Sequence, residues 1–462
     1  MAPSILLIFC AIVWILVATS ILRWHPFVVL LLAALGLGIT SGIPLADLAG
    51  VIKGGFGGVL ESIGLLIIFG TMIGIILEAS GATVAIAEHL LKAFKRLPSN
   101  IVMSHVGFMV SIPVFCDAAF IVLSSLNKTI AEQSRASRKA LTVALSTGLL
   151  APHVLVPPTP GPLAAAATLQ MDNILLLFLV GALLSWVVVM IGSLFSLVLF
   201  RGVHSSQSKT ISQGEEDQPN ETKNLQNELS VDNQHAHIPS FWLSILPILL
   251  PIVLMTLRPL SGWIDPAEMG WLHSLIGFVS DPTIALMVGV LVGLPLLSSA
   301  PSLQFHESIT KTIQQAAPIL LITAMGGALG AVIQQMNLSE SLQSLTFSPQ
   351  LGLLLPFVIA AVLKTAQGSS TVAIITTASI IFPLLPVLGY ESDLEKVWMI
   401  LSIGVGSMTV SHANDSYFWV VSQFGGLSVE EAYKSHTIAT LLQGIGGFLA
   451  LSVFVVLWSL IA

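Results

Sequence analysis

The sequence predicts an all-α polytopic membrane protein built from two inverted-topology repeats. Three observations indicate this fold class. Of the 462 residues, 55% are hydrophobic and only 9% are charged, whereas soluble domains carry about 25% charged residues. Apolar runs of about 20 residues, long enough to cross a bilayer, follow one another along the chain. Finally, three landmarks of the first half recur in the second half at nearly one offset.

We expect transmembrane helices in ten of the apolar runs. The first run has no Lys or Arg before it and leads directly into a second run, so we interpret it as a retained helix and not as a cleaved signal. The predicted spans are 4–22, 26–43, 58–90, 140–165, 174–200, 241–257, 283–298, 315–335, 397–422 and 436–461.

Two further apolar stretches are expected to enter the membrane and return on the same side. The stretch 101–127 has basic residues on both flanks, which places both of its ends in the cytoplasm. Pro113 and Asp117 interrupt its middle, so two arms of about 12 residues, each ~18 Å long, would form a re-entrant hairpin. The stretch 350–388 is interrupted at 364–370 and has flanks poor in Lys and Arg, so it is expected to enter from the opposite side.

An internal repeat relates the two hairpins. The landmarks are Gly70–Ala82 over Gly326–Leu338, Asp117 over Ser369, and His153 over His412, at offsets of 256, 252 and 259. Each half then holds five spans and one hairpin, and an odd number of spans inverts the second half relative to the first.

The repeat also sets the expected domain boundaries. A first membrane repeat occupies 1–200, and a second occupies 241–462. The segment 201–240 between them is rich in Ser, Gln, Asn and Glu and is expected to be a flexible polar linker. Arg23, with no basic residue before it, indicates an outward N-terminus, and the helix count then places the linker in the cytoplasm.

In each half, the span that follows the hairpin is interrupted by its own sequence. Five prolines fall within 140–165, and proline removes a backbone donor and clashes with the preceding turn. Within 397–422, the polar stretch SHANDS competes with helical hydrogen bonds. Irregular backbone at membrane depth is tolerated where it lines a wet cavity, so we expect both hairpin tips and both broken helices to meet at one site.

This central site has the chemistry of an anion-binding site. Half-helices that begin near Gly368 and near Asp415 would direct free N–H groups and a positive dipole end toward it, and Lys364 would add a full charge. Hydroxyl and amide groups can bond a substrate with several hydroxyls. The candidate substrate-binding residues are Lys364, Gln367, Gly368, Ser369, Ser370, Thr371, Thr159, Asn414 and Ser416.

The same site is expected to carry a proton. Burial favours the neutral form of a carboxyl group, and imidazole titrates near neutral pH. The candidate proton-coupling residues are Asp117, Asp415, His153 and His412. Structural roles stay open for each group, since a lysine can snorkel to an interface, an aspartate can cap a helix and a buried histidine can bond a carbonyl.

The sequence argues against other classes of function. It contains no HExxH, no GxSxG and no GxxxxGK[ST], so neither an enzyme nor a directly ATP-driven pump is expected. Cys10 and Cys116 lie in apolar stretches and offer no metal site. The net charge is −7 and no basic cluster suggests nucleic-acid binding. We expect no cofactor, the proton gradient being the energy source.

Four segments resemble the gluconate permease family of proton symporters. They are FCDAAF at 115–120, HVLVPPTPGP at 153–162, KTAQGSSTVA at 364–373 and SHANDSYFW at 411–419. The resemblance implies a multi-pass secondary active transporter of the bacterial inner membrane that imports gluconate or a related sugar acid with protons. It places the chain in a large ion-transporter class whose better-known members are dimers that work by an elevator motion, so a homodimer is implied as well.

The sequence departs from the gluconate carriers of this family at three positions. Lys364, Asp117 and Thr159 stand where the resemblance would place Arg, Glu and a second His. Arg grips a carboxylate with a bidentate fork that Lys does not reproduce. A different small substrate of the same family, such as glycerate or D-serine, is therefore the first alternative, and a passive anion channel is the second.

Overall fold

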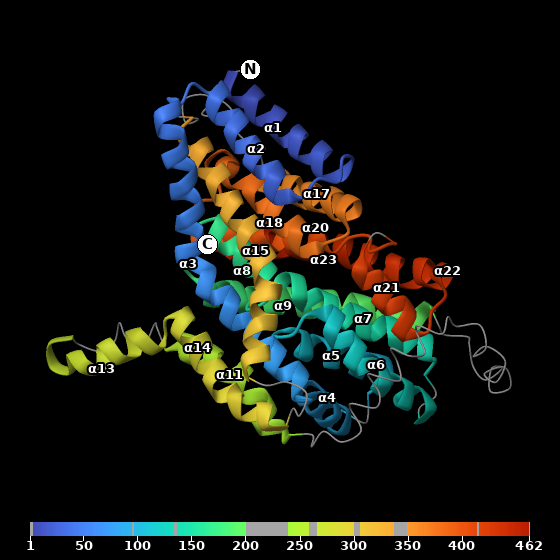
Figure 1. The fold of residues 1–462 in the computed structure, drawn as a ribbon. Coiled ribbons are helices and arrows are strands. Elements are labelled where there is room, and N and C mark those ends of the chain that lie inside the picture. The colour runs from blue at the N-terminus through green and yellow to red at the C-terminus, as the bar shows by residue number, and fades with distance from the viewer. Residues whose placement is uncertain are drawn as a thin grey trace.

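The computed structural model describes residues 3–94, 97–133, 136–199, 239–257, 266–299, 305–336, 349–413 and 415–461. Within these ranges every regular element is a helix, which confirms the predicted all-α class (Figure 1). Four described helices are long and apolar enough to cross a membrane, and six are if each bent pair counts as one span. The predicted linker lies outside the described residues except for its last two positions.

The first half contains nine described helices. They are α1 (Pro3–Ser20), α2 (Pro26–Thr40), α3 (Leu45–Ala79), α4 (Ala82–Ala93), α5 (Ser99–Ser111), α6 (Cys116–Gln133), α7 (Arg138–Leu155), α8 (Pro160–Thr168) and α9 (Ile174–Leu199).

The described α-helices of the second half are α11 (Phe241–Thr256), α13 (Pro266–Val279), α14 (Pro282–Gly293), α15 (Phe305–Gln334), α17 (Pro349–Gln367), α18 (Ser370–Ile381), α19 (Leu385–Leu388), α20 (Asp393–Ser407), α21 (Ser416–Gly425), α22 (Val429–Ala432) and α23 (Ile438–Ile461). Two 3-10 segments, η1 (Leu294–Ser299) and η2 (Phe382–Leu384), and a π-helical turn, η3 (Tyr433–Thr437), complete it.

The structure differs from the predicted spans at several places. The span 58–90 is wrong as a single helix, because α3 ends at Ala79 and the chain turns at Gly81, whose φ of +73° favours glycine. α15 begins ten residues before the predicted 315, since its polar first turns carry no apolar signal. α13 was not predicted, and it projects away from the body of the protein (Figure 1).

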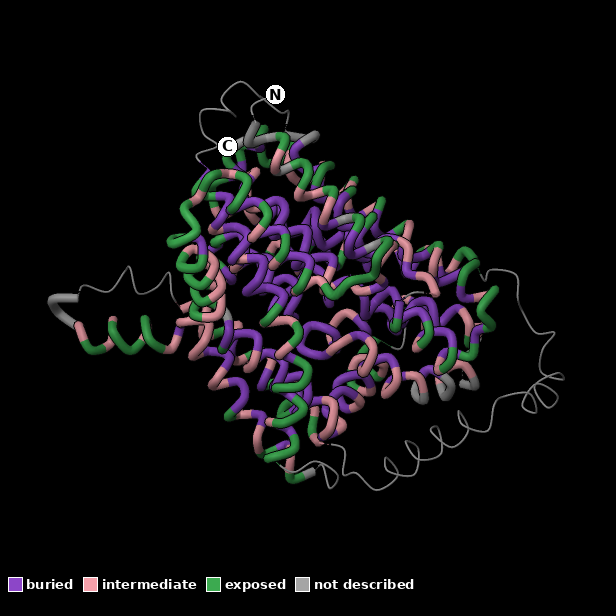
Figure 2. The backbone as a smooth tube through the Cα atoms, turned by 45° about the horizontal axis from the view of Figure 1, so that its top comes forward, coloured by how far each residue is buried: buried purple, intermediate pink, exposed green. Residues whose placement is uncertain are grey.

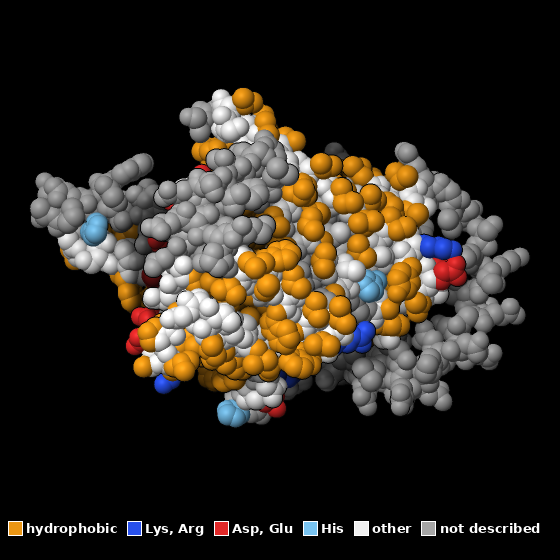
Figure 3. All heavy atoms as spheres, turned by 90° about the horizontal axis from the view of Figure 1, so that it is seen from above, with side chains coloured by type: hydrophobic (Ala, Val, Ile, Leu, Met, Phe, Trp, Pro, Cys, Tyr) orange, Lys and Arg blue, Asp and Glu red, His pale blue; other side chains and the backbone are white. Residues whose placement is uncertain are grey.

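The two long helices α3 and α15 pack closely against each other. A side chain on Gly55 of α3 would meet the carbonyl oxygen of Gly327 on α15 at 2.5 Å, so glycine is what permits this approach. Buried residues concentrate in the central helices, whereas α13 and the outer helices carry most of the exposed ones (Figure 2). Hydrophobic side chains also cover much of the face in Figure 3, and charged groups lie toward its edge.

Short helix pairs stand at both of the predicted hairpins. α5 and α6 are joined through residues 112–115, and α17 and α18 through Gly368 and Ser369. α7 packs against α5, and α20 packs against α17. The contacts also run between the halves, because α8 packs against α18 while α21 packs against α6. These contacts place the helix that follows each break against the predicted hairpin of the opposite half. The inverted orientation of the two halves stays a prediction.

Candidate functional site

A cavity of about 280 Å³ lies where α6, α7, α15, α17, α18 and α21 meet. Most of the residues singled out in the sequence line it, although they come from four separate stretches of the chain. The predicted residues in its wall are Asp117, His153, Lys364, Ser369, Ser370, Thr371, Asp415 and Ser416. The structure therefore brings one hairpin tip, both broken helices and the start of the other hairpin's second arm to a single cavity.

The side chains of Lys364 and Asp415 form a buried ion pair in this cavity. Lys364 Nζ lies 2.6 Å from Asp415 Oδ2 and also donates to the carbonyl oxygen of Gly368 at 2.9 Å. The two residues are only 1% and 3% exposed. Lys364 therefore does not snorkel to an interface; its charge is held inside the protein by a carboxylate and a carbonyl.

Two helices begin beside this ion pair. Ser369 is the N-cap of α18 and its hydroxyl accepts from Val372 N at 3.3 Å. Asp415 is the N-cap of α21, and its Oδ1 accepts from Tyr417 N at 3.1 Å. Asp415 thus uses one oxygen to cap a helix and the other to hold Lys364. The cavity wall therefore holds a lysine and two helix N-termini, groups that can bind an anion, beside the carboxylates of Asp415 and Asp117.

The first half contributes polar groups without partners. Asp117 Oδ1 and His153 Nδ1 are buried and have no hydrogen-bond partner among the described residues. Both side chains line the cavity, where the ring of Phe115 lies 5.8 Å from that of His153. Buried polar atoms are normally satisfied, so the lack of a described partner sets these two atoms apart.

Four of the remaining predicted residues lie outside the cavity wall. Both amide atoms of Gln367 are buried without a described partner, and Gly368 contributes its carbonyl to Lys364. The hydroxyl of Thr159 donates to the carbonyl oxygen of Val156. A ring nitrogen of His412 lies 2.9 Å from the carbonyl oxygen of Thr365. Asn414 lies outside the described residues.

Sequence reasoning missed a polar network behind the ion pair. Ser411 Oγ donates to Asp415 Oδ2, the oxygen that also holds Lys364. His436 Nε2 lies 3.2 Å from Ser411 Oγ, and His436 Nδ1 lies 3.1 Å from Ser146 Oγ. His436 is fully buried on the π-helical turn at the start of α23. The predicted span 436–461 placed it at a helix end, where a polar residue gives no signal.

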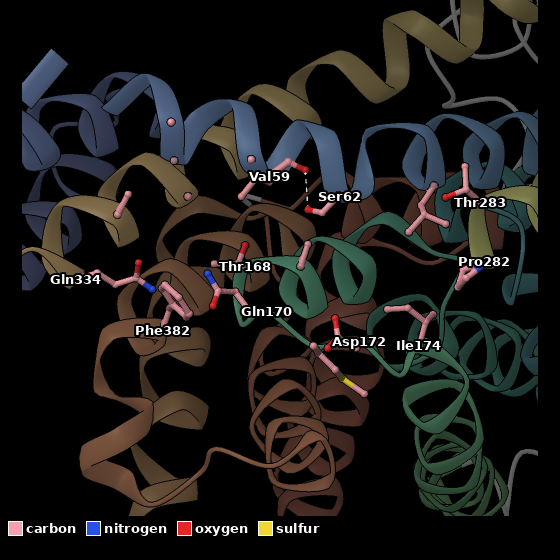
Figure 4. A pocket seen from close by; sticks show the side chains of 18 of the residues that line it. Val59, Ser62, Thr168, Gln170, Asp172, Ile174, Pro282, Thr283, Gln334 and Phe382 are labelled. Carbon is pink, nitrogen blue, oxygen red and sulfur yellow. Dashed lines mark hydrogen bonds between the residues drawn. The ribbon is translucent and has the colours of Figure 1, made fainter. Parts of the chain in front are cut away.

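A second, larger cavity of about 630 Å³ lies elsewhere in the fold (Figure 4). Ser62, Thr168 and Gln170 contribute polar groups to its wall, and none of the predicted site residues lines it. Along α15, Ile322 faces the smaller cavity and Gln334 the larger one. Between these two levels Gly326 packs directly against Ser379 of α18. α15 therefore lines both cavities and contacts α18 between these two levels.

No cluster of metal-binding side chains occurs in the part of the chain that the structure describes. The site therefore consists of an ion pair, hydroxyl groups, two unpartnered polar atoms and two helix N-termini.

Comparison with known proteins gives consistent results. The model of the GntP family permease matches residues 3–461. A gluconate permease of Pseudomonas aeruginosa is 31% identical over 460 residues, covering 97% of this chain and 96% of the relative. A D-serine transporter of Escherichia coli K12 is 29% identical over 429 residues and covers 92% of each chain.

A solved structure with a similar fold is the YdaH transporter of Alcanivorax borkumensis. It superposes with a TM-score of 0.61 over 94% of this chain and 98% of that one, at 16% sequence identity. At this identity the similarity shows the fold alone.

Proposed function

This chain belongs to the GntP permease family, as a multi-pass protein of the bacterial inner membrane, and from that premise we propose that it imports gluconate or a related sugar acid together with a proton. The observation that carries the proposal is the buried pair of Lys364 and Asp415 in a cavity lined by hydroxyl groups. A cation, two helix N-termini and several hydroxyls match a carboxylate that bears hydroxyls.

The ion pair offers a reason for proton coupling. An entering substrate carboxylate competes with Asp415 for Lys364, and a carboxylate that loses its partner inside the protein is costly. Uptake of a proton by Asp415 removes this cost and leaves Lys364 free for the substrate. Since each binding event then favours the other, the pair couples one proton to one anionic substrate.

D-serine is the second candidate substrate, and Asp117 is the observation that favours it. An amino acid brings an ammonium group as well as a carboxylate, and the ammonium needs an acceptor. Asp117 lines the same cavity, and its carboxylate can accept a hydrogen bond from this ammonium group.

Uptake of labelled gluconate into proteoliposomes tests the proposal. We expect saturable uptake that an inward proton gradient stimulates, and competition by unlabelled glycerate and D-serine ranks the substrates. Lys364→Ala is expected to abolish uptake. Lys434→Ala serves as the matched control, because Lys434 is an exposed lysine paired with Glu430.

Three results would contradict the proposal. Uptake that does not saturate would indicate a channel, and uptake indifferent to the gradient would remove proton coupling. Transport by Lys364→Ala at the wild-type rate would refute the anion site. The homodimer is a separate proposal, checked by the mass of the protein in detergent.

A further inference from the structure

The ion pair is connected to His436 by one hydroxyl group. Ser411 Oγ contacts Asp415 Oδ2 on one side and His436 Nε2 on the other. Two hydrogen bonds fix the backbone of Ser411. Its N–H donates to Thr440 Oγ1 at 3.0 Å, and its carbonyl oxygen accepts from Thr437 Oγ1 at 2.6 Å. Ser411, Asp415 and His436 are all buried, so the connection between them runs through the protein.

The hydrogen-bond inventory determines which atoms carry protons. Asp415 is paired with Lys364 and is therefore ionised, so the single hydroxyl hydrogen of Ser411 points to Asp415 Oδ2. Ser411 then has only lone pairs for His436, and Nε2 of His436 must carry a hydrogen. The geometry thus assigns a proton to the nitrogen that faces the ion pair.

The other ring nitrogen tolerates both protonation states. Ser146 Oγ lies 3.1 Å from His436 Nδ1 and 3.0 Å from the carbonyl oxygen of Val143. When Nδ1 is bare, Ser146 can donate to it; when Nδ1 carries a hydrogen, Ser146 can accept from it and donate to Val143 instead. Turning one hydroxyl hydrogen therefore satisfies either neutral or protonated His436 without movement of the ring.

We propose that His436 holds the coupled proton in the empty transporter and passes it to Asp415 through Ser411 when substrate arrives, an inference that rests on the proposed symport. Substrate draws Lys364 away from Asp415. The Ser411 O–H bond breaks as its hydrogen moves to Asp415 Oδ2, and the Nε2–H proton of His436 forms a new bond to Ser411 Oγ. Asp415 ends neutral, Ser411 is regenerated, and His436 is left neutral with its hydrogen on Nδ1.

The surroundings of His436 suit this role. Asp415 and Lys364 are the charged groups that face it from across the network, and Tyr417 of α21 lies against its ring at a centroid distance of 5.5 Å. α7 presents the neutral Ser146, while Tyr417 donates its own hydroxyl hydrogen to the carbonyl of Ser146. Glu430 and Glu431 precede the turn and pair with Lys434 and Lys139, respectively, so these charges are compensated elsewhere.

Labelled gluconate in proteoliposomes tests the inference through two assays on the same preparation. Gradient-driven accumulation requires release of the proton, whereas exchange of internal for external gluconate does not. For His436→Gln we expect exchange at acidic pH to match the wild type, because solvent can then protonate Asp415 directly. At neutral pH we expect its accumulation to fall about tenfold, a shift of roughly one unit in the pH profile.

A second pair of variants separates the relay from a packing effect. Ser411→Ala keeps His436 but removes the connecting hydroxyl, and it should reproduce the His436→Gln profile. Ser411→Thr retains a hydroxyl and should restore the wild-type profile. If wild-type protein accumulates gluconate while Ser411→Ala or His436→Gln shows an unchanged pH profile, the relay is wrong and the symport proposal stands. If the wild-type protein itself shows no gradient-driven accumulation, the symport proposal fails first.

Discussion

The two halves of the protein bring different kinds of polar group to one cavity. The second half supplies charges that are already paired, since Lys364 and Asp415 hold each other and Asp415 also caps α21. The first half supplies Asp117 and His153, each with a buried atom that has no described partner. Among the residues that line the cavity, the second half thus pairs its two charges, whereas the first half leaves Asp117 Oδ1 and His153 Nδ1 without a described partner.

This difference indicates a division of labour. A buried ion pair can exist in two states. A ligand with the same charge as one partner can replace that partner, and a proton can then neutralise the displaced carboxylate. Unpartnered polar atoms have no competitor to displace and are ready to contact a ligand directly. We therefore expect the second half to couple the substrate to the proton and the first half to select the substrate.

The largest expected effect comes from breaking the pair. Lys364→Ala leaves Asp415 buried without its partner, which costs about 3–5 kcal/mol of unfolding free energy. The double variant Lys364→Ala/Asp415→Ala removes both charges and should recover part of this loss. Thermal unfolding in detergent, monitored by tryptophan fluorescence, measures the stability of the single and the double variant. Lys434→Ala is expected to unfold as the wild type does, and a double variant no more stable than Lys364→Ala would show that the pair is not the cause.

The sequence revealed the members of this pair but not the pairing. Polar residues are expensive at membrane depth, so Lys364, Asp415 and Asp117 stand out from their apolar surroundings. The contact between Lys364 and Asp415 joins residues 51 positions apart and depends on how α17 meets α21, which no local pattern encodes.

The misses have similar physical reasons. His436 was missed because it lies on a π-helical turn at the edge of an apolar run, where polar residues are ordinary. The end of α3 at Ala79 was missed because the apolar pattern continues through the turn at Gly81 into α4. The fold class, in contrast, follows from composition and run length alone.

The second prediction concerns the packing that both halves share. A Cβ on Gly148 of α7 would strike the carbonyl oxygen of Ser104 on α5, and a Cβ on Gly406 of α20 would strike that of Phe357 on α17. Backbone atoms cannot rotate away, so each glycine-to-alanine substitution should cost about 1–3 kcal/mol. The control is Gly36→Ala, since a Cβ there meets nothing within 4 Å.

Thermal unfolding of the three variants tests whether the halves are built alike. Similar losses of unfolding free energy for Gly148→Ala and Gly406→Ala would indicate that the two halves share this helix packing although their cavity residues differ. A large loss in one half and none in the other would show that the halves differ in packing as well.

The third prediction compares α18, which begins after the turn at Gly368 and Ser369, with α8, which begins at the break in the first half. Ser369 caps α18 through Val372 N, so Ser369→Ala should cost about 1 kcal/mol. Thr159 stands at the start of α8 but makes no side-chain cap bond there, so Thr159→Ala should cost less. Unfolding midpoints measure the difference, and an equal or larger loss at Thr159 would contradict this assignment of the caps. Ser369→Ala should also weaken gluconate uptake, since Ser369 lines the cavity.

The smallest expected change in stability is that of Asp117→Asn, which tests the division of labour between the two halves most directly. Asp117→Asn should alter the unfolding free energy by less than about 1 kcal/mol, because Asp117 Oδ1 has no described hydrogen bond to lose. Its effect should appear in selectivity: an amide cannot compensate an ammonium charge, so D-serine should compete less well against labelled gluconate. Gradient-driven accumulation of gluconate should persist, because the second half holds the proton. Loss of accumulation with exchange retained would instead assign the proton to Asp117, and the division of labour between the halves would be reversed.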